Sequence, residues 1–275
     1  MSWLSAHLFD PGDLDDLLLK TVRPLITELT ADGLCESAFF LRHADGGPHI
    51  RMRVLTGDPG AAWERIRARA HTLRTRPVLV PYEPENDKYG TGAALEAAER
   101  HFAESSALAG RVLAQRPSPA QRVALTLSCV LLTQLTGESG PRAAAVRLAE
   151  GLRWWKPYEP GPVEEPPEQV VRHAELMWRA ARGEYEWSPA APESAWQATI
   201  RTLHDTWVAL DDAGRFNARR PLWADQAGTG RHPAVRVALD HCAHLFANRL
   251  GVPMDTEAAL RRIAAAATTR LGRTA

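Results

Sequence analysis

The sequence predicts an α+β fold with a mixed or antiparallel sheet and a largely helical second half. Two observations lead to this prediction: extended patterns lie early in the chain, at 39–54 and 77–83, and long helical patterns dominate after residue 91. Early strands followed by many helices are typical of α+β folds rather than of doubly wound ones. With 275 residues, of which 45% are hydrophobic, the chain can bury a large core, and we expect a single domain over 1–275.

The first part of the chain is expected to run helix, two strands, helix, strand. Leucines recur at helical spacing over 11–31, where Pro24 predicts a bend. A tight hairpin is predicted at 39–54. An aspartate and a proline then open a predicted helix over 58–74, and the apolar residues at 77–83 are again typical of a strand.

The second half of the chain is predominantly helical by its hydrophobic periodicity. Ser118 and Pro119 cap a segment that is apolar nearly all round, which predicts a buried central helix. The stretch 156–168 holds five prolines and four glutamates and is expected to be an exposed connection. Helices are predicted at 92–114, 120–135, 169–182, 194–213, 233–250 and 254–271.

Charge and cysteine usage limit the possible partners. The 33 basic and 33 acidic residues balance, so no global field favours binding to nucleic acid or to an anionic membrane. Cys35, Cys129 and Cys242 are widely separated in apolar stretches, which indicates reduced core thiols. The chain lacks a signal-peptide pattern and any run of 18 apolar residues. We therefore expect a soluble, cytoplasmic protein with no nucleic-acid or membrane partner.

Four familiar catalytic motifs are missing from the sequence: GxGxxG, GxxxxGK[ST], GxSxG and HExxH. Nucleotide binding, serine hydrolysis and zinc proteolysis therefore lack a sequence basis. His241 and His244 lie one turn apart on a predicted helix, but no acidic or thiol ligand set accompanies them. No metal site is expected.

The hairpin FFLRHADGGPHIRMRV at 39–54 carries the strongest candidate site. Its second strand points His49, Arg51 and Arg53 to one face and three apolar residues to the other. One imidazole and two guanidiniums so close together suit binding of a carboxylate or of an anion that develops during reaction. Arg42 of the same hairpin is a further candidate for substrate binding. The alternative is that these arginines lie on a solvated strand face.

The segment PYEPENDKYG at 81–90 brings further polar side chains to the end of a predicted strand. Tyr82 or Tyr89 is a candidate donor to an oxyanion. Glu83 or Glu85 is a candidate partner that pairs with a hairpin arginine and orients it. A turn rich in proline, asparagine and glycine has the same composition for purely local reasons, and this alternative stays open.

The segment HCAHLFANRLG at 241–251 offers a candidate general acid or base. His244 and Asn248 are four residues apart and share a helical face, with Cys242 turned away. Neutral imidazole near pH 7 suits proton transfer, and Asn248 is a candidate to hold the imidazole ring or a substrate amide. The alternative is that His244 is a hydrogen-bonded core residue.

Two adjacent tryptophans, Trp154 and Trp155, precede a lysine and are candidates to line a groove for a peptide. Tryptophan is more often a packing residue, so a structural role is the alternative.

Five segments together resemble one protein family in content and order: SWLSAHLF, FFLRHADGGPHIRMR, YEPENDKYG, the serine pair at 105–106, and HLFANRLG. They resemble the C-terminal, elimination-type domain of class I lanthipeptide dehydratases, which also occurs as a stand-alone protein in thiopeptide biosynthesis. The resemblance spans nearly the whole chain. It implies the fold of that elimination domain and a role in making ribosomally synthesised, modified peptides.

The resemblance implies an enzyme without metal or organic cofactor that acts on a precursor peptide, with other biosynthetic enzymes as further possible partners. Thiopeptide pyridine synthases join two dehydroalanines in a formal [4+2] cycloaddition and then lose water and the leader peptide, which gives an antibiotic macrocycle. The lanthipeptide lyases instead expel glutamate from glutamylated serine or threonine to leave a dehydroamino acid. A non-catalytic protein that binds the precursor peptide is a third reading.

The resemblance implies roles for single residues of this chain, by their positions in the matching segments. His49, Arg51 and Arg53 match the histidine and following arginines of the family, and His244 matches the histidine that handles protons in the elimination enzymes. Where the family usually has an arginine before YGG, this chain has Lys88, which loses the bidentate fork and favours pyridine formation over glutamate elimination. The resemblance also implies a cleft for a dehydroalanine-containing peptide between the hairpin and the 233–250 helix.

Overall fold

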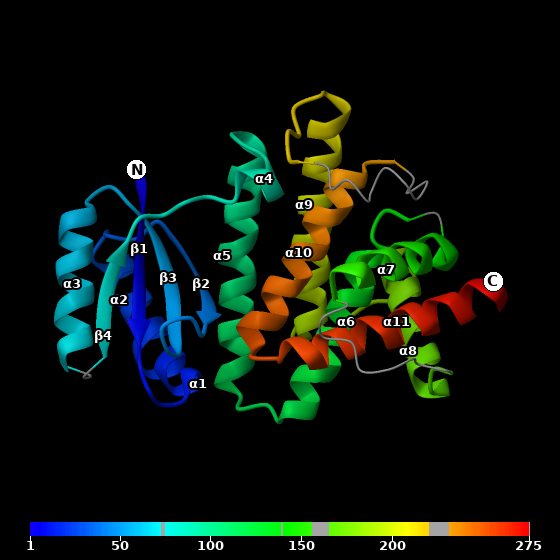
Figure 1. Ribbon diagram of the computed structural model, residues 1–275, viewed down its shortest axis with the longest axis horizontal. Coiled ribbons are helices and arrows are strands. Elements are labelled where there is room, and N and C mark those ends of the chain that lie inside the picture. The colour runs from blue at the N-terminus through cyan, green and yellow to red at the C-terminus, as the bar shows by residue number, and fades with distance from the viewer. Residues whose placement is uncertain (73–74, 139, 156–164, 220–230, 275) are drawn as a thin grey trace. The chain divides into compact units, whose positions relative to one another are not determined.

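The computed structural model describes residues 1–72, 75–138, 140–155, 165–219 and 231–274 (Figure 1). Packing divides the chain into two compact units. The first comprises Met1–Pro84 and Phe102–Arg116, and the second comprises Glu85–His101 and Pro117–Ala275. Each unit is considered by itself below, and the single domain over 1–275 stays a prediction.

The first unit is built on a four-stranded antiparallel sheet, which confirms the α+β prediction and its antiparallel variant. The strand order is β2-β3-β1-β4. The predicted hairpin is present as the β2–β3 pair. The bounds are β1 Ser2–Phe9, β2 Ser37–His43, β3 His49–Thr56 and β4 Arg76–Val80.

The sequence prediction was wrong about the start of the chain, because it contained no strand at β1. This strand is central and pairs with both β3 and β4. Its signal was an alternation in which Leu4, Ala6 and Leu8 are buried on one face. Trp3 and Phe9 place large aromatic side chains on the other face, and this weakens the contrast that makes an alternating strand recognisable.

One face of the sheet is apolar and covered by helices. The buried side chains of β1 on this face lie beside Ile50, Met52 and Val54 of β3, each of which is fully buried. A single sequence register places all of them on the same side, because side chains alternate along a strand. The covering helices are α1 Leu14–Leu17, η1 Leu18–Val22, α2 Arg23–Ala31 and α3 Pro59–Thr72 (Figure 1).

A π-helical turn lies just before Pro24, and the bend predicted at this proline stays a prediction. Helix α1 passes through the π-helical segment η1 before α2 begins, and Pro24 lies in the first turn of α2. Proline has no N–H to donate to the preceding turn and its ring crowds the carbonyl there, so the regular α-helical hydrogen bonds cannot continue through it.

The second unit is helical. Helix α6 is its buried centre, as predicted: every residue from Leu125 to Leu135 is buried, and Ser118 forms a capping box with Gln121. Helix α7 was not predicted from the sequence. The helices of this unit are α4 Asn86–Tyr89, the start of α5 Ala93–Ala114, α6 Pro119–Leu135, α7 Pro141–Trp155, α8 Glu168–Ala181, α9 Pro192–Asp212, α10 Pro233–Leu250 and α11 Met254–Thr274 (Figure 1).

The other predicted helices are confirmed to within a few residues. Asp58 accepts a hydrogen bond from the amide of Ala61 at 2.9 Å at the start of α3, and Gly251 closes α10 in the left-handed conformation. Most of the predicted connection at 156–168 lies outside the described residues. The three cysteines are free and buried, as expected.

Candidate functional site

The face of the sheet opposite helices α1–α3 gathers polar and aromatic side chains, as the alternation of the hairpin predicts. On this face, Arg51 of β3 lies across from Leu41 of β2 and His7 of β1. His49 lies across from His43 and Phe9, two pairs further along the ladder. Strand pairing therefore brings His7 of β1 together with His43 and His49 of the hairpin.

His49 is held at the centre of this group. Its Nδ1 donates to the carbonyl oxygen of Gly47 at 2.8 Å, and its side chain is almost fully buried. The rings of Phe9 and His7 lie 4.3 Å and 4.9 Å from the His49 ring, centroid to centroid. These ring contacts, one stacked and one tilted, restrict the orientation of the His49 imidazole.

The positive charge of this face resides on its arginines. Burial, followed by the Arg51 guanidinium, lowers the pKa of His7 to about 4, and the same two causes lower the pKa of His43. Both imidazoles are therefore neutral near pH 7. Arg51 and Arg53 supply the cationic groups that suit a carbonyl or an anion.

Arg53 lies among aromatic rings. Its guanidinium carbon is 5.7 Å from the centre of the Phe39 ring and 5.9 Å from that of Tyr82, within the range of cation–π attraction. The rings of Tyr82 and Trp3 are 5.8 Å apart. The structure thus brings Tyr82 beside a hairpin arginine, and its predicted role as a donor to an oxyanion stays a prediction.

Arg42 does not lie on this face. Its Nη2 is 2.5 Å from Oδ1 of Asp15 in α1, and both side chains are 12% exposed. Arg42 pairs in register with the buried Ile50, so it points toward the helices. The expectation that Arg42 binds substrate alongside Arg51 and Arg53 is corrected: its place on the opposite face gives it the structural role of tying β2 to α1.

The segment after Pro84 belongs to the second unit and packs against it. Lys88 forms an ion pair with Glu85, so each neutralises the other's charge. Tyr89 is buried, with its ring centre 6.3 Å from that of Trp207 and 6.5 Å from that of His241. Tyr89 is therefore a core residue of this unit.

A close backbone approach fixes this segment. The amide of Thr91 donates to Oδ1 of Asn217 at 2.8 Å. Gly90 adopts a φ of 78°, and a Cβ atom there would lie only 2.8 Å from the same oxygen. Only glycine fits this position without strain, which explains the Tyr-Gly sequence in structural terms.

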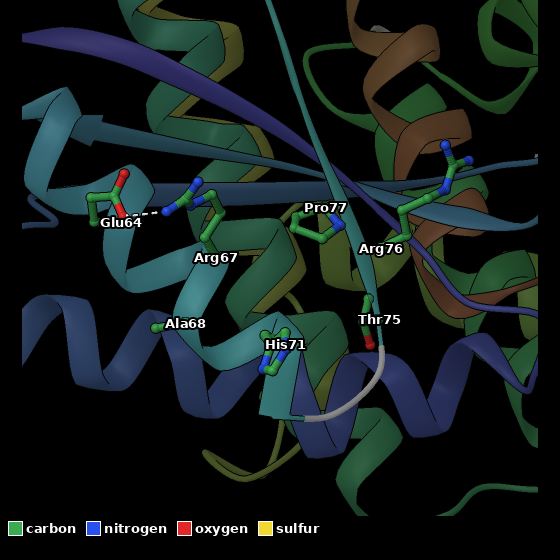
Figure 2. Close-up of a pocket in the computed structure, with 7 residues that line it drawn as sticks. All are labelled: Glu64, Arg67, Ala68, His71, Thr75, Arg76 and Pro77. Carbon is green, nitrogen blue, oxygen red and sulfur yellow. Dashed lines mark hydrogen bonds and ion pairs between the residues drawn. The ribbon is translucent and has the colours of Figure 1, made fainter.

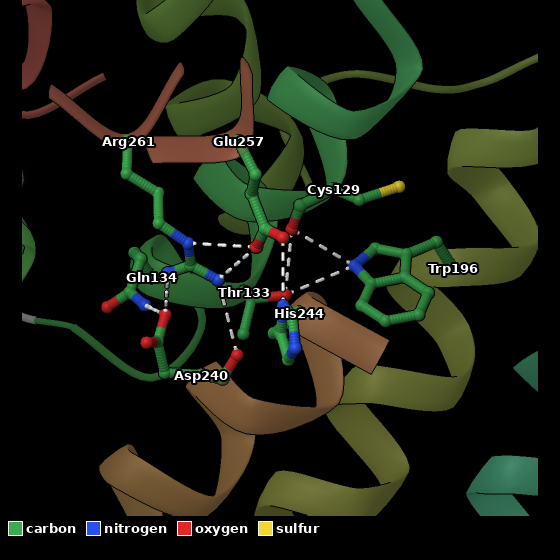
Figure 3. Close-up of polar contacts among 8 residues, drawn as sticks. All are labelled: Cys129, Thr133, Gln134, Trp196, Asp240, His244, Glu257 and Arg261. Carbon is green, nitrogen blue, oxygen red and sulfur yellow. Dashed lines mark hydrogen bonds and ion pairs between the residues drawn. The ribbon is translucent and has the colours of Figure 1, made fainter. Parts of the chain in front are cut away.

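His244 is held by a network of polar and charged side chains on α10, α11 and α6 (Figure 3). Its Nδ1 donates to Oε2 of Glu257 at 2.8 Å, and the Glu257 side chain is 1% exposed. Nε of Arg261 donates to the other oxygen of Glu257 at 3.0 Å, and Arg261 also pairs with Asp240. Gln134 donates to Asp240 at 2.5 Å.

This network orients the His244 imidazole. Because the carboxylate accepts the proton on Nδ1, Nε2 carries the lone pair. The imidazole side chain is 28% exposed. Although burial lowers it, the carboxylates of Asp240 and Glu257 raise the pKa of Arg261 overall, so this residue stays charged.

The sequence identified His244 but not the residues that hold it. Glu257 and Arg261 lie four apart on the predicted amphipathic helix 254–271, where an acidic and a basic residue at this spacing are usually a surface pair. Their burial depends on the packing of α11 against α6 and α10, which no local pattern reveals. Asn248 shares the partly exposed face of α10 with His244, and Cys242 is buried, both as predicted.

Comparison with known proteins decides the family. The model of the family described as lantibiotic biosynthesis dehydratase C-term matches residues 3–268. The chain belongs to this family. No curated protein matched the chain.

Solved structures share the fold of this family member. The pyridine synthase TbtD from thiomuracin biosynthesis matches with a TM-score of 0.70 and 18% identity over 100% of both chains. TsrL matches with a TM-score of 0.71 and 18% identity over 98% of both chains. The tRNA-dependent lantibiotic dehydratase MibB from Microbispora sp. 107891 matches with a TM-score of 0.62 and 20% identity, covering 99% of this chain and 28% of that one.

The predicted peptide groove at Trp154 and Trp155 and the predicted cleft at the hairpin both stay predictions. Trp154 and Trp155 end helix α7, and their side chains lie outside the described residues. The cleft between the hairpin and α10 stays a prediction.

Across the described residues, we find no group of three or more histidine, cysteine, aspartate or glutamate side chains arranged to hold a metal ion. No helix in the described part of the chain is both long and apolar enough to cross a lipid bilayer.

The first unit also has an open groove of about 820 Å³ between α3 and β4 (Figure 2). Arg67 and Glu64 form an ion pair at its rim, with a separation of 2.8 Å. The groove contains none of the residues that the sequence singled out, and the function proposed below does not use it. Its lining residues are Glu64, Arg67, Ala68, His71, Thr75, Arg76 and Pro77.

Buried histidines make the second unit sensitive to acid. Burial, followed by the charge of Arg249, lowers the pKa of His101 to about 3, and Nδ1 of His101 lies 3.1 Å from Oγ1 of Thr199. The folded state thus keeps His101 neutral, while the unfolded chain binds a proton below its ordinary pKa of 6.5. The stability that this histidine contributes is present above pH 6.5 and is lost as the pH falls toward 3.

We expect the free energy of unfolding to fall by roughly 2 kcal/mol between pH 7 and pH 5 on account of His101 alone. Urea unfolding at the two pH values checks this for wild type and for His101→Asn, which keeps a polar group near Nδ1. The variant should lose less stability than wild type over this interval. An equal loss in both proteins would show that His101 titrates normally.

Proposed function

We propose that this protein modifies a ribosomally made precursor peptide and forms a pyridine macrocycle. In this reaction two dehydroalanines join in a formal [4+2] cycloaddition, after which water and the leader peptide are eliminated. The observation that carries the proposal is the oriented, partly exposed imidazole of His244 on its buried carboxylate, Glu257. Family membership and the full-length likeness to the pyridine synthase TbtD support the peptide substrate and the reaction type.

The polar face of the sheet in the first unit suits binding of the reacting amide. Arg51 and Arg53 donate hydrogen bonds to the backbone carbonyl that becomes the iminol of the aza-diene, and His49 orients Arg51. Tyr82 adds a hydroxyl donor beside Arg53. Tyr89 is less suited to this role, because its ring is buried against Trp207 and His241.

His244 handles protons during aromatisation. Nε2 accepts a proton from the six-membered ring that the cycloaddition creates, and the resulting imidazolium delivers a proton to the departing group. Glu257 keeps the imidazole in the required tautomer and stabilises its charged form. Asn248, one turn along α10, is placed on the same face to hold a substrate amide.

Holding the two dehydroalanines close together supplies the rest of the rate acceleration. Two alkenes in a flexible peptide meet rarely in solution, and holding them together can supply on the order of 7 to 11 kcal/mol of the barrier in favourable cases. This chemistry needs no redox step, so we propose an enzyme that works without metal or organic cofactor.

Glutamate elimination is the second candidate. It is favoured by the fold match to the dehydratase MibB and by the same His244–Glu257 pair, which suits any proton abstraction. The ion pair between Lys88 and Glu85 disfavours it. Lysine lacks the planar fork that binds a carboxylate in two places, and the neighbouring glutamate already neutralises its charge.

The mass changes of two precursor peptides distinguish pyridine formation from glutamate elimination. We expect purified protein, in buffer with a chelator, to convert a precursor with two dehydroalanines into a product that lacks the leader peptide and one water. A precursor with glutamylated serine should keep its glutamate. Loss of glutamate from the second peptide would establish the lyase instead, and unchanged masses for both, with retained binding, would establish a precursor-binding protein.

A further inference from the structure

Arg51 is held by two imidazoles on the polar face of the sheet. Its Nη2 is 3.0 Å from Nδ1 of His43, and its Nε donates to Nε2 of His49 at 3.4 Å. His43 and His49 face each other across the β2–β3 ladder, so they reach the guanidinium from different strands. These two hydrogen bonds reduce the conformational freedom of the Arg51 side chain, which is otherwise flexible.

The hydrogen-bond pattern fixes the protonation of both rings. A guanidinium can only donate, so each imidazole nitrogen that contacts Arg51 must be unprotonated. His49 Nδ1 donates to the carbonyl of Gly47, which leaves Nε2 as its acceptor. Nδ1 of His43 also faces the amide of Asp45 at 3.3 Å, a second donor, so the proton of neutral His43 belongs on Nε2.

We propose that His43 is a positioning residue, which holds the Arg51 guanidinium in place by accepting its hydrogen bond as a neutral imidazole. This inference rests on the proposed function, in which an oriented Arg51 donates a hydrogen bond to the substrate carbonyl. His43 was not singled out by the sequence, although it lies within the hairpin. Strand pairing reveals its role, since His43 meets Arg51 only across the ladder.

The groups around His43 favour its neutral form. Burial and the charge of Arg51 lower its pKa, with smaller contributions from His49 and Arg53, and Asp45 alone acts in the opposite direction. His7 of β1 completes the surroundings and is itself neutral near pH 7, since its pKa is about 4. Protonated His43 would present an N–H to the N–H of Arg51, so acid releases the guanidinium.

The first test is a titration that needs no substrate. In NMR spectra with labelled histidine rings, we identify His43 as the resonance missing from His43→Asn. Its pKa should lie below 6.5 in wild type and should rise in Arg51→Met. Arg67→Gln, which removes an arginine of α3 that pairs with Glu64, serves as the control and should leave the titration unchanged. An ordinary pKa that does not respond to Arg51→Met would overturn the proposal.

The second test uses turnover of the precursor with two dehydroalanines. His43→Asn keeps an acceptor near the position of Nδ1 but does not titrate, whereas His43→Leu keeps neither property. At pH 8 we expect kcat/KM of the asparagine variant to stay within about threefold of wild type and that of the leucine variant to fall about tenfold or more. The ratio of His43→Asn to wild type should rise as the pH falls, since only wild type loses its acceptor.

These two tests separate the inference from the proposed function. Because His244 is present in both proteins, its own titration cancels in the ratio of His43→Asn to wild type. A ratio that stays flat between pH 8 and pH 5.5 in an active enzyme contradicts the positioning role and leaves the function intact. If no peptide is modified, the proposed function fails, and the NMR titration still decides whether His43 holds Arg51.

Discussion

His244→Gln is expected to lower kcat for the precursor with two dehydroalanines by roughly 10²- to 10⁴-fold, the range typical of a lost general acid or base. Glutamine is similar in size and polar, so the partly exposed site should tolerate it and the fold should remain intact. The measurement is a single-turnover time course by mass spectrometry, combined with circular dichroism and thermal unfolding. The reason is physical: without an imidazole at this position, no group on α10 is oriented by Glu257 to move protons.

His71→Gln is the matched control for this experiment. His71 is exposed, lies at the end of α3 in the open groove and has no part in the proposed chemistry. Its replacement should leave kcat within about twofold of wild type, as for most surface changes. Wild-type kcat in His244→Gln would remove the histidine from the mechanism, whatever the control shows.

Arg53→Met is expected to reduce kcat/KM by roughly 10²- to 10³-fold, the effect of removing one preorganised donor from a developing oxyanion. Methionine keeps part of the packing against Phe39 and Tyr82 but loses the charge and all hydrogen bonds. Arg53→Lys should restore only part of the activity, because an ammonium keeps the charge without the planar fork or the stacking. Initial rates over a range of peptide concentrations measure this.

The order of activity among wild type, Arg53→Lys and Arg53→Met shows whether the reaction requires the geometry of the guanidinium or only its charge. If lysine restores full activity, a positive charge alone suffices and the stacked geometry of Arg53 is irrelevant. If methionine is as active as wild type, the polar face of the hairpin takes no part in the reaction. Arg67→Gln changes charge on α3 of the same unit and should behave like wild type.

Features that depend on local chemistry were predictable from the sequence. The alternation that separates His49, Arg51 and Arg53 from the apolar side chains follows from the two-residue period of a strand, and the structure confirms it. The same rule places Arg42 on the covered face, where it pairs with Asp15, so its predicted role in substrate binding was the weakest part of the hairpin prediction. The placement of His244 and Asn248 on one face of α10 was equally local.

Features that depend on packing between distant segments were not predictable. Glu257 meets His244 only because α11 packs beside α10, and a carboxylate thirteen positions along the chain carries no periodic signal toward a histidine. The contact between His43 and Arg51 requires the register of the β2–β3 ladder. Strand β1 was missed although it is central, because its apolar side chains lie on both faces.

The most direct test of the central claim is the stoichiometry of products from the precursor with two dehydroalanines. We predict that wild-type protein releases free leader peptide and a dehydrated macrocycle in a 1:1 ratio, at equal rates, with mass spectrometry following both. A leader peptide that stays attached while the wild-type protein is folded and binds the precursor would contradict the account.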